Sequence, residues 1–198
     1  MLQLIWPSRC AGCRALQPHT LCPGCLPAAA TRAMGDMEAW YLEEYASGLG
    51  RALRRAKYLP DRGLAVRLAE SCAPLLAEPG RDRVDAVVPV PSTRRRRARR
   101  GFELAHILAQ PVAAVLGVPL VRALRCRGGP PQAGLSGPAR QRNLVGRIRG
   151  THTTPNRVLL VDDMYTTGAT VAACATELLG CTTSELVVAT LCISRPDS

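Results

Sequence analysis

Two adjacent carboxylates and a small-residue loop lie close together in the sequence. Asp162 and Asp163 follow four apolar residues (158–161), and after two further residues comes the run Thr166, Thr167, Gly168, Ala169 and Thr170. Carboxylates accept hydrogen bonds from hydroxyls or hold a metal, while backbone amides and threonine hydroxyls can hold a phosphate. A sugar phosphate needs both chemistries. Paired acids after a strand also suit a magnesium site in a nucleotide hydrolase, although the GxxxxGK[ST] loop of P-loop enzymes is absent from the sequence.

The residues around the acids predict a strand, a loop and a helix. The apolar run 158–161 indicates a buried strand, and residues 171–179 form an apolar helical run that Gly180 closes. Ligands of open α/β sheets bind at the carboxyl ends of the strands. We therefore expect the acids and the loop to form a binding site at that edge.

The rest of the chain alternates between predicted strands and helices. This alternation predicts an α/β fold with a parallel sheet flanked by helices. We expect a linker at 27–38, a short strand or turn at 40–45, strands at 84–90, 118–124 and 185–193, helices at 49–56, 64–76 and 104–116, and a mobile Gly/Pro-rich loop at 125–143.

The basic residues are concentrated in one third of the chain. The net charge is +11, and residues 81–150 contain fifteen arginines against three acids. A strand end at Pro91, Ser92 and Thr93 leads into the arginine run that starts at Arg94. Such a field predicts a polyanionic partner, either a phosphate, a pyrophosphate or a nucleic acid. The alternative is a solvated helix face or a general basic patch.

Four of the nine cysteines form two matched CxxC pairs near the N-terminus, Cys10 with Cys13 and Cys22 with Cys25. Four thiolates at this spacing predict a closed, structural tetrahedral zinc site. Free thiols, a redox CxxC, or His19 in place of one cysteine are the alternatives. We predict a zinc module and linker at 1–35 and a larger domain at 36–198.

Length and composition fit a small globular protein. The chain has 198 residues, of which 47% are hydrophobic, and contains no apolar run of membrane-spanning length. The N-terminal sequence lacks the basic lead and the apolar core of a signal peptide. The expected location is the cytoplasm, without membrane insertion.

Phosphoribosyl pyrophosphate (PRPP) is a ligand that would use the paired acids, the small-residue loop and the start of the arginine run together. Its 5′-phosphate would lie in the loop at 166–170, and its ribose hydroxyls would donate to Asp162 and Asp163. Residues 91–94 would hold the pyrophosphate. Mg²⁺ would bridge pyrophosphate and hydroxyl oxygens, since it prefers hard oxygen ligands.

The sequence resembles the ComF family of competence-associated, type I phosphoribosyltransferase-like proteins. Four features carry the resemblance, in the order of the chain: the paired CxxC, Lys57-Tyr58, VPVPSTRRRRARRGF, and QAGLSGPARQRNLVG before VLLVDDMYTTGAT. The resemblance implies a type I phosphoribosyltransferase domain with an N-terminal zinc module, PRPP contacts at the residues named above, and a lid that contains Gln132, Leu135, Ser136, Arg140 and Asn143.

Four positions depart from the family pattern: Glu103-Leu104 replaces an Asn-Gln pair, Gly129 replaces Thr, and Ala139 replaces Glu. Two functions are therefore expected. The first is Mg-dependent phosphoribosyl transfer from PRPP to an unknown acceptor. The second is a non-catalytic module that senses PRPP or binds single-stranded DNA through residues 81–150, in contact with DNA-uptake machinery on the cytoplasmic side.

Overall fold

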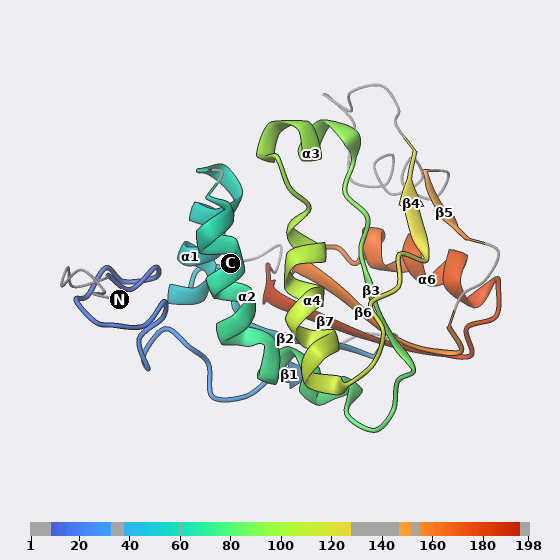
Figure 1. The fold of residues 1–198 in the computed structure, drawn as a ribbon, viewed down its shortest axis with the longest axis horizontal. Helices are drawn as coiled ribbons and strands as arrows, with labels where there is room; N and C mark the ends of the chain where they lie inside the picture. The colour runs from blue at the N-terminus through green and yellow to red at the C-terminus, as the bar shows by residue number, and fades with distance from the viewer. Residues whose placement is uncertain (1–8, 33–37, 60, 128–146, 152–154, 195–198) are drawn as a thin grey trace, which may run out of the picture.

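A mostly parallel sheet forms the centre of the molecule (Figure 1). The computed structural model describes residues 9–32, 38–59, 61–127, 147–151 and 155–194. Within these residues the strand order is β1-β2-β7-β6-β3, with only β1 antiparallel to its neighbour. The predicted α/β fold is thus confirmed. The strands are β1 (Thr31–Arg32), β2 (Ala39–Glu44), β3 (Ala86–Pro89), β6 (Arg157–Tyr165) and β7 (Glu185–Ile193).

Helices cover both faces of this sheet (Figure 1). One face packs against α1 (Gly48–Tyr58), α2 (Arg62–Ala77) and α4 (Leu104–Leu116). The other packs against α6 (Ala169–Leu179) and a separate two-stranded sheet of β4 (Leu124–Cys126) and β5 (Ile148–Gly150). A 3-10 turn, η1 (Glu78–Gly80), precedes β3 in the chain, and α3 (Arg94–Arg100) follows β3. No described helix is long and apolar enough to span a bilayer.

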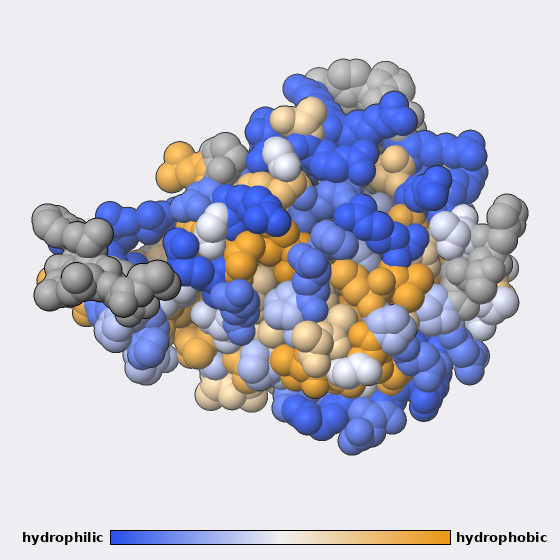
Figure 2. Space-filling model, in the orientation of Figure 1, coloured by the Kyte–Doolittle hydropathy of each residue, from blue (hydrophilic) through white to orange (hydrophobic). Residues whose placement is uncertain are grey.

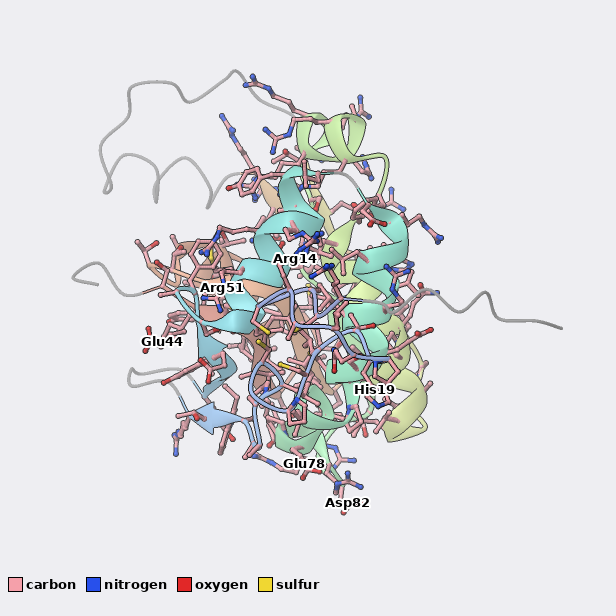
Figure 3. The ribbon with its side chains drawn as sticks, turned by 90° about the vertical axis from the view of Figure 1, so that its left-hand side faces the viewer. Arg14, His19, Glu44, Arg51, Glu78 and Asp82 are labelled. Atoms are coloured by element: carbon pink, nitrogen blue, oxygen red, sulfur yellow. The ribbon has the colours of Figure 1, made fainter. Side chains whose placement is uncertain are left out.

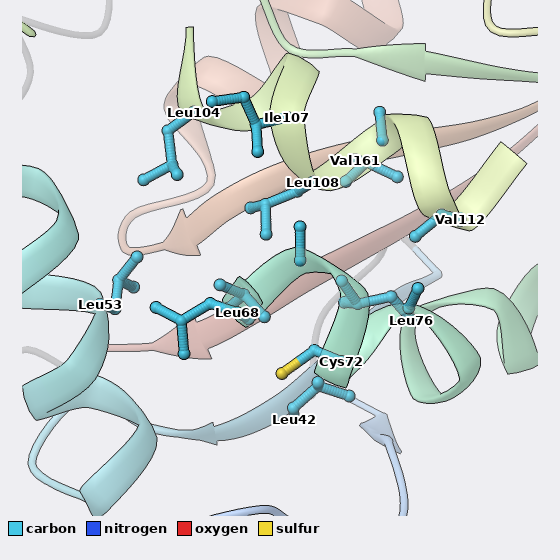
Figure 4. Close-up of a cluster of buried hydrophobic side chains, with 14 of the residues drawn as sticks. Leu42, Leu53, Leu68, Cys72, Leu76, Leu104, Ile107, Leu108, Val112 and Val161 are labelled. Atoms are coloured by element: carbon cyan, nitrogen blue, oxygen red, sulfur yellow. The ribbon is translucent and has the colours of Figure 1, made fainter. Parts of the chain in front are cut away.

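The strand β6 alternates between two hydrophobic cores. Leu159 and Val161 pack on the side of α1, α2 and α4, in the cluster drawn in Figure 4, whereas Val158 and Leu160 pack on the side of α6. Successive side chains of a strand point to opposite faces of its sheet. The same alternation carries Asp163 towards the α1 side and Asp162 towards the α6 side.

The strand predicted at 118–124 is wrong in extent. This segment makes one parallel bridge, between Val87 and Leu120, and the next strand is β4, which belongs to the smaller sheet. Pro119 has no N–H to donate to a strand ladder, which limits the pairing. The predicted linker at 27–38 contains β1, and most of the predicted loop at 125–143 lies outside the described residues.

Candidate functional site

The candidate residues at the carboxyl ends of β3 and β6 lie at one edge of the sheet. Pro89 of β3 is in register with Val161 of β6, and the next amide, Val90 N, donates to Val161 O at 2.9 Å. The loop that starts at Pro91 and the acids that follow Val161 therefore emerge side by side. The structure thus brings together two regions that are about 70 residues apart in the sequence.

Two cations converge on Asp163. Lys57 Nζ of α1 lies 2.8 Å from Asp163 Oδ1, and Arg100 Nη1 at the end of α3 lies 3.9 Å from Asp163 Oδ2. The exposed fractions of the three side chains are 7% for Lys57, 9% for Arg100 and 16% for Asp163. This ion-pair cluster fixes the orientation of the Asp163 side chain.

The sequence placed Lys57 in the family resemblance and Arg100 in the arginine run, but it did not predict that either residue contacts Asp163. Their contact with Asp163 joins residues more than 60 positions apart, which local patterns do not encode. Two signals were present for Lys57: it is the single lysine of an arginine-rich chain, and it belongs to the Lys57-Tyr58 pair of the family resemblance. Arg100 is one of six arginines in the run, and the sequence does not distinguish this buried side chain from its exposed neighbours.

Asp162 has a different environment from its neighbour. Its Oδ1 accepts a hydrogen bond from the Asp163 amide at 2.8 Å. Burial, reinforced by the negative charge of Asp163, raises the pKa of Asp162 to about 7. Near neutral pH this carboxyl group therefore exchanges between a proton-donating and a purely accepting form.

The loop at 166–170 ends at the N-terminus of α6. Gly168 is the residue before the helix and has a left-handed backbone, with φ of 71°. Thr167 Oγ1 accepts from Ala169 N at 3.5 Å, and Thr166 and Thr167 are exposed. Thr170 is the second residue of α6. The first-turn amides and the positive end of the helix dipole favour an anion here.

Gly168→Ala is expected to destabilise the protein by more than about 1–2 kcal/mol, the usual penalty for a left-handed non-glycine residue. A Cβ at Gly168 would meet the Tyr165 hydroxyl at 2.5 Å, in addition to that penalty. Gly101→Ala is the matched control, since Gly101 also has a positive φ (78°) but no atom within 4 Å of its added Cβ. Urea denaturation of both variants measures the difference. Equal losses of stability would contradict the close packing of Tyr165 on the loop.

The arginine run after Thr93 forms a helix. Thr93 Oγ1 caps α3 by accepting from Arg96 N at 3.3 Å, and Gly101 ends the helix with a left-handed backbone. The arginines of α3 other than Arg100 are exposed, so they form a solvated basic face. Figure 2 shows this hydrophilic surface over α3 at the top of the molecule.

The four cysteines of the CxxC pairs lie together. Their sulfur atoms are all within 4.8 Å of one another, and the Cys13 and Cys22 sulfurs are 3.6 Å apart. Zn–S bonds of about 2.3 Å in a tetrahedron place the sulfurs roughly 3.8 Å apart, so the cluster fits zinc. His19, the alternative ligand, is not part of the described cluster.

The Cys10 sulfur is prepared as an anionic ligand. It accepts backbone N–H bonds from Gly12 and Cys22, each at 3.4 Å. Burial raises the pKa of the Cys10 thiol, but backbone hydrogen bonds from Cys13, Cys22 and Gly12 together outweigh burial and lower the pKa to about 6. A zinc ion held by these four thiolates would have no open position, and its contribution would be structural.

The cysteine module packs directly on α1. Cys10 and Cys25 belong to the same buried cluster as Leu49 and Leu53 of α1. Arg51 Nε donates to Gly12 O at 3.1 Å and Arg55 Nη1 donates to Ala11 O at 3.3 Å, and Figure 3 faces this side of the molecule. Two basic side chains of α1, Arg51 and Arg55, thus help to hold the module. The same helix, α1, also bears Lys57, which pairs with Asp163. The domain boundary at residue 35 stays a prediction.

The predicted lid residues Gln132, Leu135, Ser136, Arg140 and Asn143 lie outside the described residues. Their contribution to the site stays a prediction.

Sequence similarity to known proteins shows the family of this chain. The chain is 32% identical over 194 residues to the DNA utilization protein YhgH of Salmonella typhimurium, which covers 86% of this chain and 83% of that protein. It is also 32% identical over 180 residues to the YhgH protein of Escherichia coli K12, which covers 81% of this chain and 78% of that protein. The chain belongs to the ComF-like family.

The resemblance predicted from the sequence is therefore confirmed. Among solved structures, the ComF-like chain is similar to a purine phosphoribosyltransferase from Pyrococcus horikoshii Ot3, with a TM-score of 0.40 and 21% identity, covering 65% of this chain and 73% of that chain. No family model matches the chain.

Proposed function

We propose that this ComF-like chain binds PRPP with Mg²⁺ and transfers its phosphoribosyl group to an acceptor. One observation carries the proposal: two carboxylates near the carboxyl end of β6 are followed, after two residues, by a glycine-containing loop at the N-terminus of α6. The carboxylates can accept hydrogen bonds from ribose hydroxyls, and the loop amides a few residues later can donate to a phosphate, so together they match a ribose 5-phosphate.

Each group of residues has a role in the proposal. The loop at 166–170 holds the 5′-phosphate, and Asp162 and Asp163 accept hydrogen bonds from the ribose hydroxyls. Residues 91–94 hold the pyrophosphate with backbone amides and the Arg94 charge. Mg²⁺, when bound with PRPP, neutralises part of the pyrophosphate charge through hard oxygen ligands.

The residues act by position and charge in the proposed reaction. The bond between ribose C1 and the pyrophosphate oxygen breaks as the acceptor bonds to C1, and pyrophosphate leaves with the bonding electrons. Positive charge develops on the ribose ring, and the Asp163 carboxylate would stabilise that charge. Lys57 and Arg100 hold this carboxylate in one orientation, which avoids reorganisation during the step.

The affinity for PRPP is expected to increase between about pH 6 and about pH 8. Because the pKa of Asp162 is raised to about 7, this carboxyl group of the folded protein loses its proton across that range. Deprotonation supplies the acceptor that a ribose hydroxyl needs. The raised pKa also affects stability. Between about pH 4 and pH 7 the native state holds a proton on Asp162 that the unfolded state has lost, so the contribution of this group to the free energy of unfolding falls as the pH rises.

Asp162→Asn is the control for this pH dependence, because PRPP itself titrates in the same range. Affinities of both proteins are measured by calorimetry across the pH series. An identical pH dependence in the wild type and in Asp162→Asn would contradict the assignment of Asp162.

Pyrophosphate release from PRPP tests the transfer step. The assay uses a panel of candidate acceptors, with Mg²⁺ present and with the Asp162→Asn/Asp163→Asn variant as the blank. Acceptor-dependent release that the variant loses supports an enzyme. Tight PRPP binding without release for any acceptor favours a sensor and counts against transfer.

A non-catalytic module that senses PRPP or binds single-stranded DNA in the cytoplasm is the second candidate. The exposed arginines of α3 favour it, as does Tyr58, which is 62% exposed and has Arg99 5.9 Å from the centre of its ring. Phe102, by contrast, is buried and offers no stacking surface. The two relatives are named DNA utilization proteins. Binding of this kind would weaken steeply with salt, and a flat salt dependence would count against it.

A further inference from the structure

The C-terminal ends of α1 and α3 meet beside Asp163. Lys57 is the next-to-last residue of α1 and Arg100 is the last residue of α3, and both contact this carboxylate. Their sequence neighbours also approach each other, with the guanidinium carbon of Arg99 5.9 Å from the centre of the Tyr58 ring. We call Tyr58, Arg99 and Arg100 the α1–α3 junction. It lies next to the proposed ribose site.

Arg100 is a buried guanidinium group whose hydrogen-bonding capacity is largely unused. Its side chain is 9% exposed, and its Nε is buried without a hydrogen-bond partner among the described residues. Its Nη1 lies 3.9 Å from Asp163 Oδ2, farther than the about 2.7–2.9 Å of a charge-assisted hydrogen bond. Burial lowers the pKa of Arg100, and the charge of Asp163 offsets this only in part. Buried polar atoms normally have partners, so this site favours a ligand that accepts hydrogen bonds from Arg100.

Tyr58 offers an aromatic face close to that guanidinium group. Its side chain is 62% exposed, and the adjacent Leu59 is 63% exposed, so two large apolar side chains lie together on the surface. Tyr58 is near enough to Arg100 to raise the pKa of Arg100, against the larger effect of burial. A planar ring bound at this surface can therefore stack on Tyr58 and reach Arg100 with a substituent.

The charges around the junction favour an anionic ligand. The positive charges of Arg96 and Arg99 also lower the pKa of Arg100, so three guanidinium groups act on one place. Within the described part of the chain, Arg96 and Arg99 form no ion pair. The nearby Asp163 carboxylate already pairs with Lys57 at 2.8 Å. A carboxylate on the ligand would match the paired N–H donors of a guanidinium group.

We propose that the α1–α3 junction binds the acceptor of the phosphoribosyl group, and that this acceptor is a planar heteroaromatic ring bearing a carboxylate. The inference rests on the proposed function, which leaves the acceptor open. The ring stacks on Tyr58, and its carboxylate accepts hydrogen bonds from Arg100. An aliphatic carboxylate would use the guanidinium group alone and leave the aromatic face uncovered. In the transfer step a ring nitrogen without a proton gives its electron pair to ribose C1, and pyrophosphate leaves with the electrons of the broken C1–oxygen bond.

Calorimetric titration of two probes of the same shape, pyridine-3-carboxylate and pyridine-3-carboxamide, tests the proposal without PRPP. The wild type is expected to bind the carboxylate at least roughly tenfold more tightly than the carboxamide. Arg100→Gln is expected to bring the ratio of the two affinities close to one. Arg67→Gln is the control, because Arg67 is an exposed arginine of α2 outside the junction, and it is expected to keep the wild-type ratio. The ratio compares two ligands of one protein, so a loss of stability alone leaves it unchanged.

Variants of Tyr58 separate stacking from the recognition of charge. Tyr58→Leu is expected to weaken the binding of both probes by a similar factor of roughly 3–10, with their ratio and the affinity for PRPP unchanged. Tyr58→Phe keeps the aromatic ring and is expected to retain the affinities of the wild type.

The proposal would be overturned by a wild type that does not bind or does not prefer the carboxylate, by a wild-type ratio in Arg100→Gln, or by equal affinities in Tyr58→Leu and Tyr58→Phe. Each protein is also titrated with PRPP and Mg²⁺. Wild-type PRPP binding without a preference for the carboxylate would refute the junction and leave the proposed function standing. A carboxylate preference that Arg100→Gln abolishes, in a chain that does not bind PRPP, would support the junction as a binding site while the proposed function fails.

Discussion

Asp163→Asn is expected to weaken PRPP binding by roughly 10–100-fold while the zinc content of the protein stays unchanged. The substitution replaces a charged acceptor by a neutral amide, and a hydrogen bond to a charged group contributes about 1.5–3 kcal/mol. The acid lies on β6, whereas the described hydrogen bonds between α1 and the cysteine module come from Arg51 and Arg55 and not from Lys57. Equilibrium dialysis with labelled PRPP and metal analysis of the same samples measure the two properties.

Stability has to be separated from binding in this variant. Removing the Asp163 charge leaves the nearly buried Lys57 without its partner at 2.8 Å, and breaking a buried pair costs about 3–5 kcal/mol. In the double variant Lys57→Met/Asp163→Asn neither charge remains, so much of that stability is expected to return while PRPP binding stays weak. Recovery of both stability and PRPP affinity would show that Asp163 acts only through the fold.

Asp85→Asn is the matched control for the same chemical change. Asp85 pairs with Arg157 at 2.7 Å at the opposite, amino-terminal edge of β3 and β6. Its loss is expected to leave PRPP affinity at the wild-type value. A similar loss of affinity in both variants would point to a general effect of charge.

Removal of zinc is expected to destabilise the whole molecule by several kcal/mol. Structural zinc contributes folding free energy directly. Here two of its proposed ligands, Cys10 and Cys25, are buried in the core cluster that α1 and α2 share. Cys22→Ser is expected to lower both the zinc content and the urea midpoint, because one of four thiolates is lost.

Cys181→Ser controls for the loss of a thiol as such. Cys181 is exposed and lies outside the module, where its sulfur donates to Thr151 O at 3.8 Å. This variant is expected to keep its zinc and its stability. Purified wild-type protein without zinc, or a stability that Cys22→Ser leaves unchanged, would contradict the zinc site.

Local sequence patterns predicted the elements that form the candidate site. The buried strand β6, its acidic end and helix α6 follow from an apolar run, adjacent charges and a helical period, all within about 20 residues. The CxxC spacing likewise brought four sulfurs together. In each case the residues that interact are close in sequence, so their pattern carries the information.

Long-range contacts were not predictable in the same way. The meeting of Lys57 and Arg100 at Asp163 depends on how α1 and α3 pack at one sheet edge. The role of Arg51 and Arg55 in holding the cysteine module depends on a tertiary contact with backbone carbonyls. At 118–124 the apolar run predicted a strand. Pro119 has no N–H to donate, and the segment forms one bridge to β3, between Val87 and Leu120.

Calorimetric titration of PRPP in the presence of Mg²⁺ tests the central claim most directly. The wild-type chain and the Asp162→Asn/Asp163→Asn variant are titrated under the same conditions, with ribose 5-phosphate as a second ligand. We expect saturable PRPP binding by the wild type, weaker binding of ribose 5-phosphate, and at least a roughly tenfold loss of PRPP affinity in the variant. No binding of PRPP by folded, wild-type protein, or equal affinity in the two proteins, would contradict the assignment of this site.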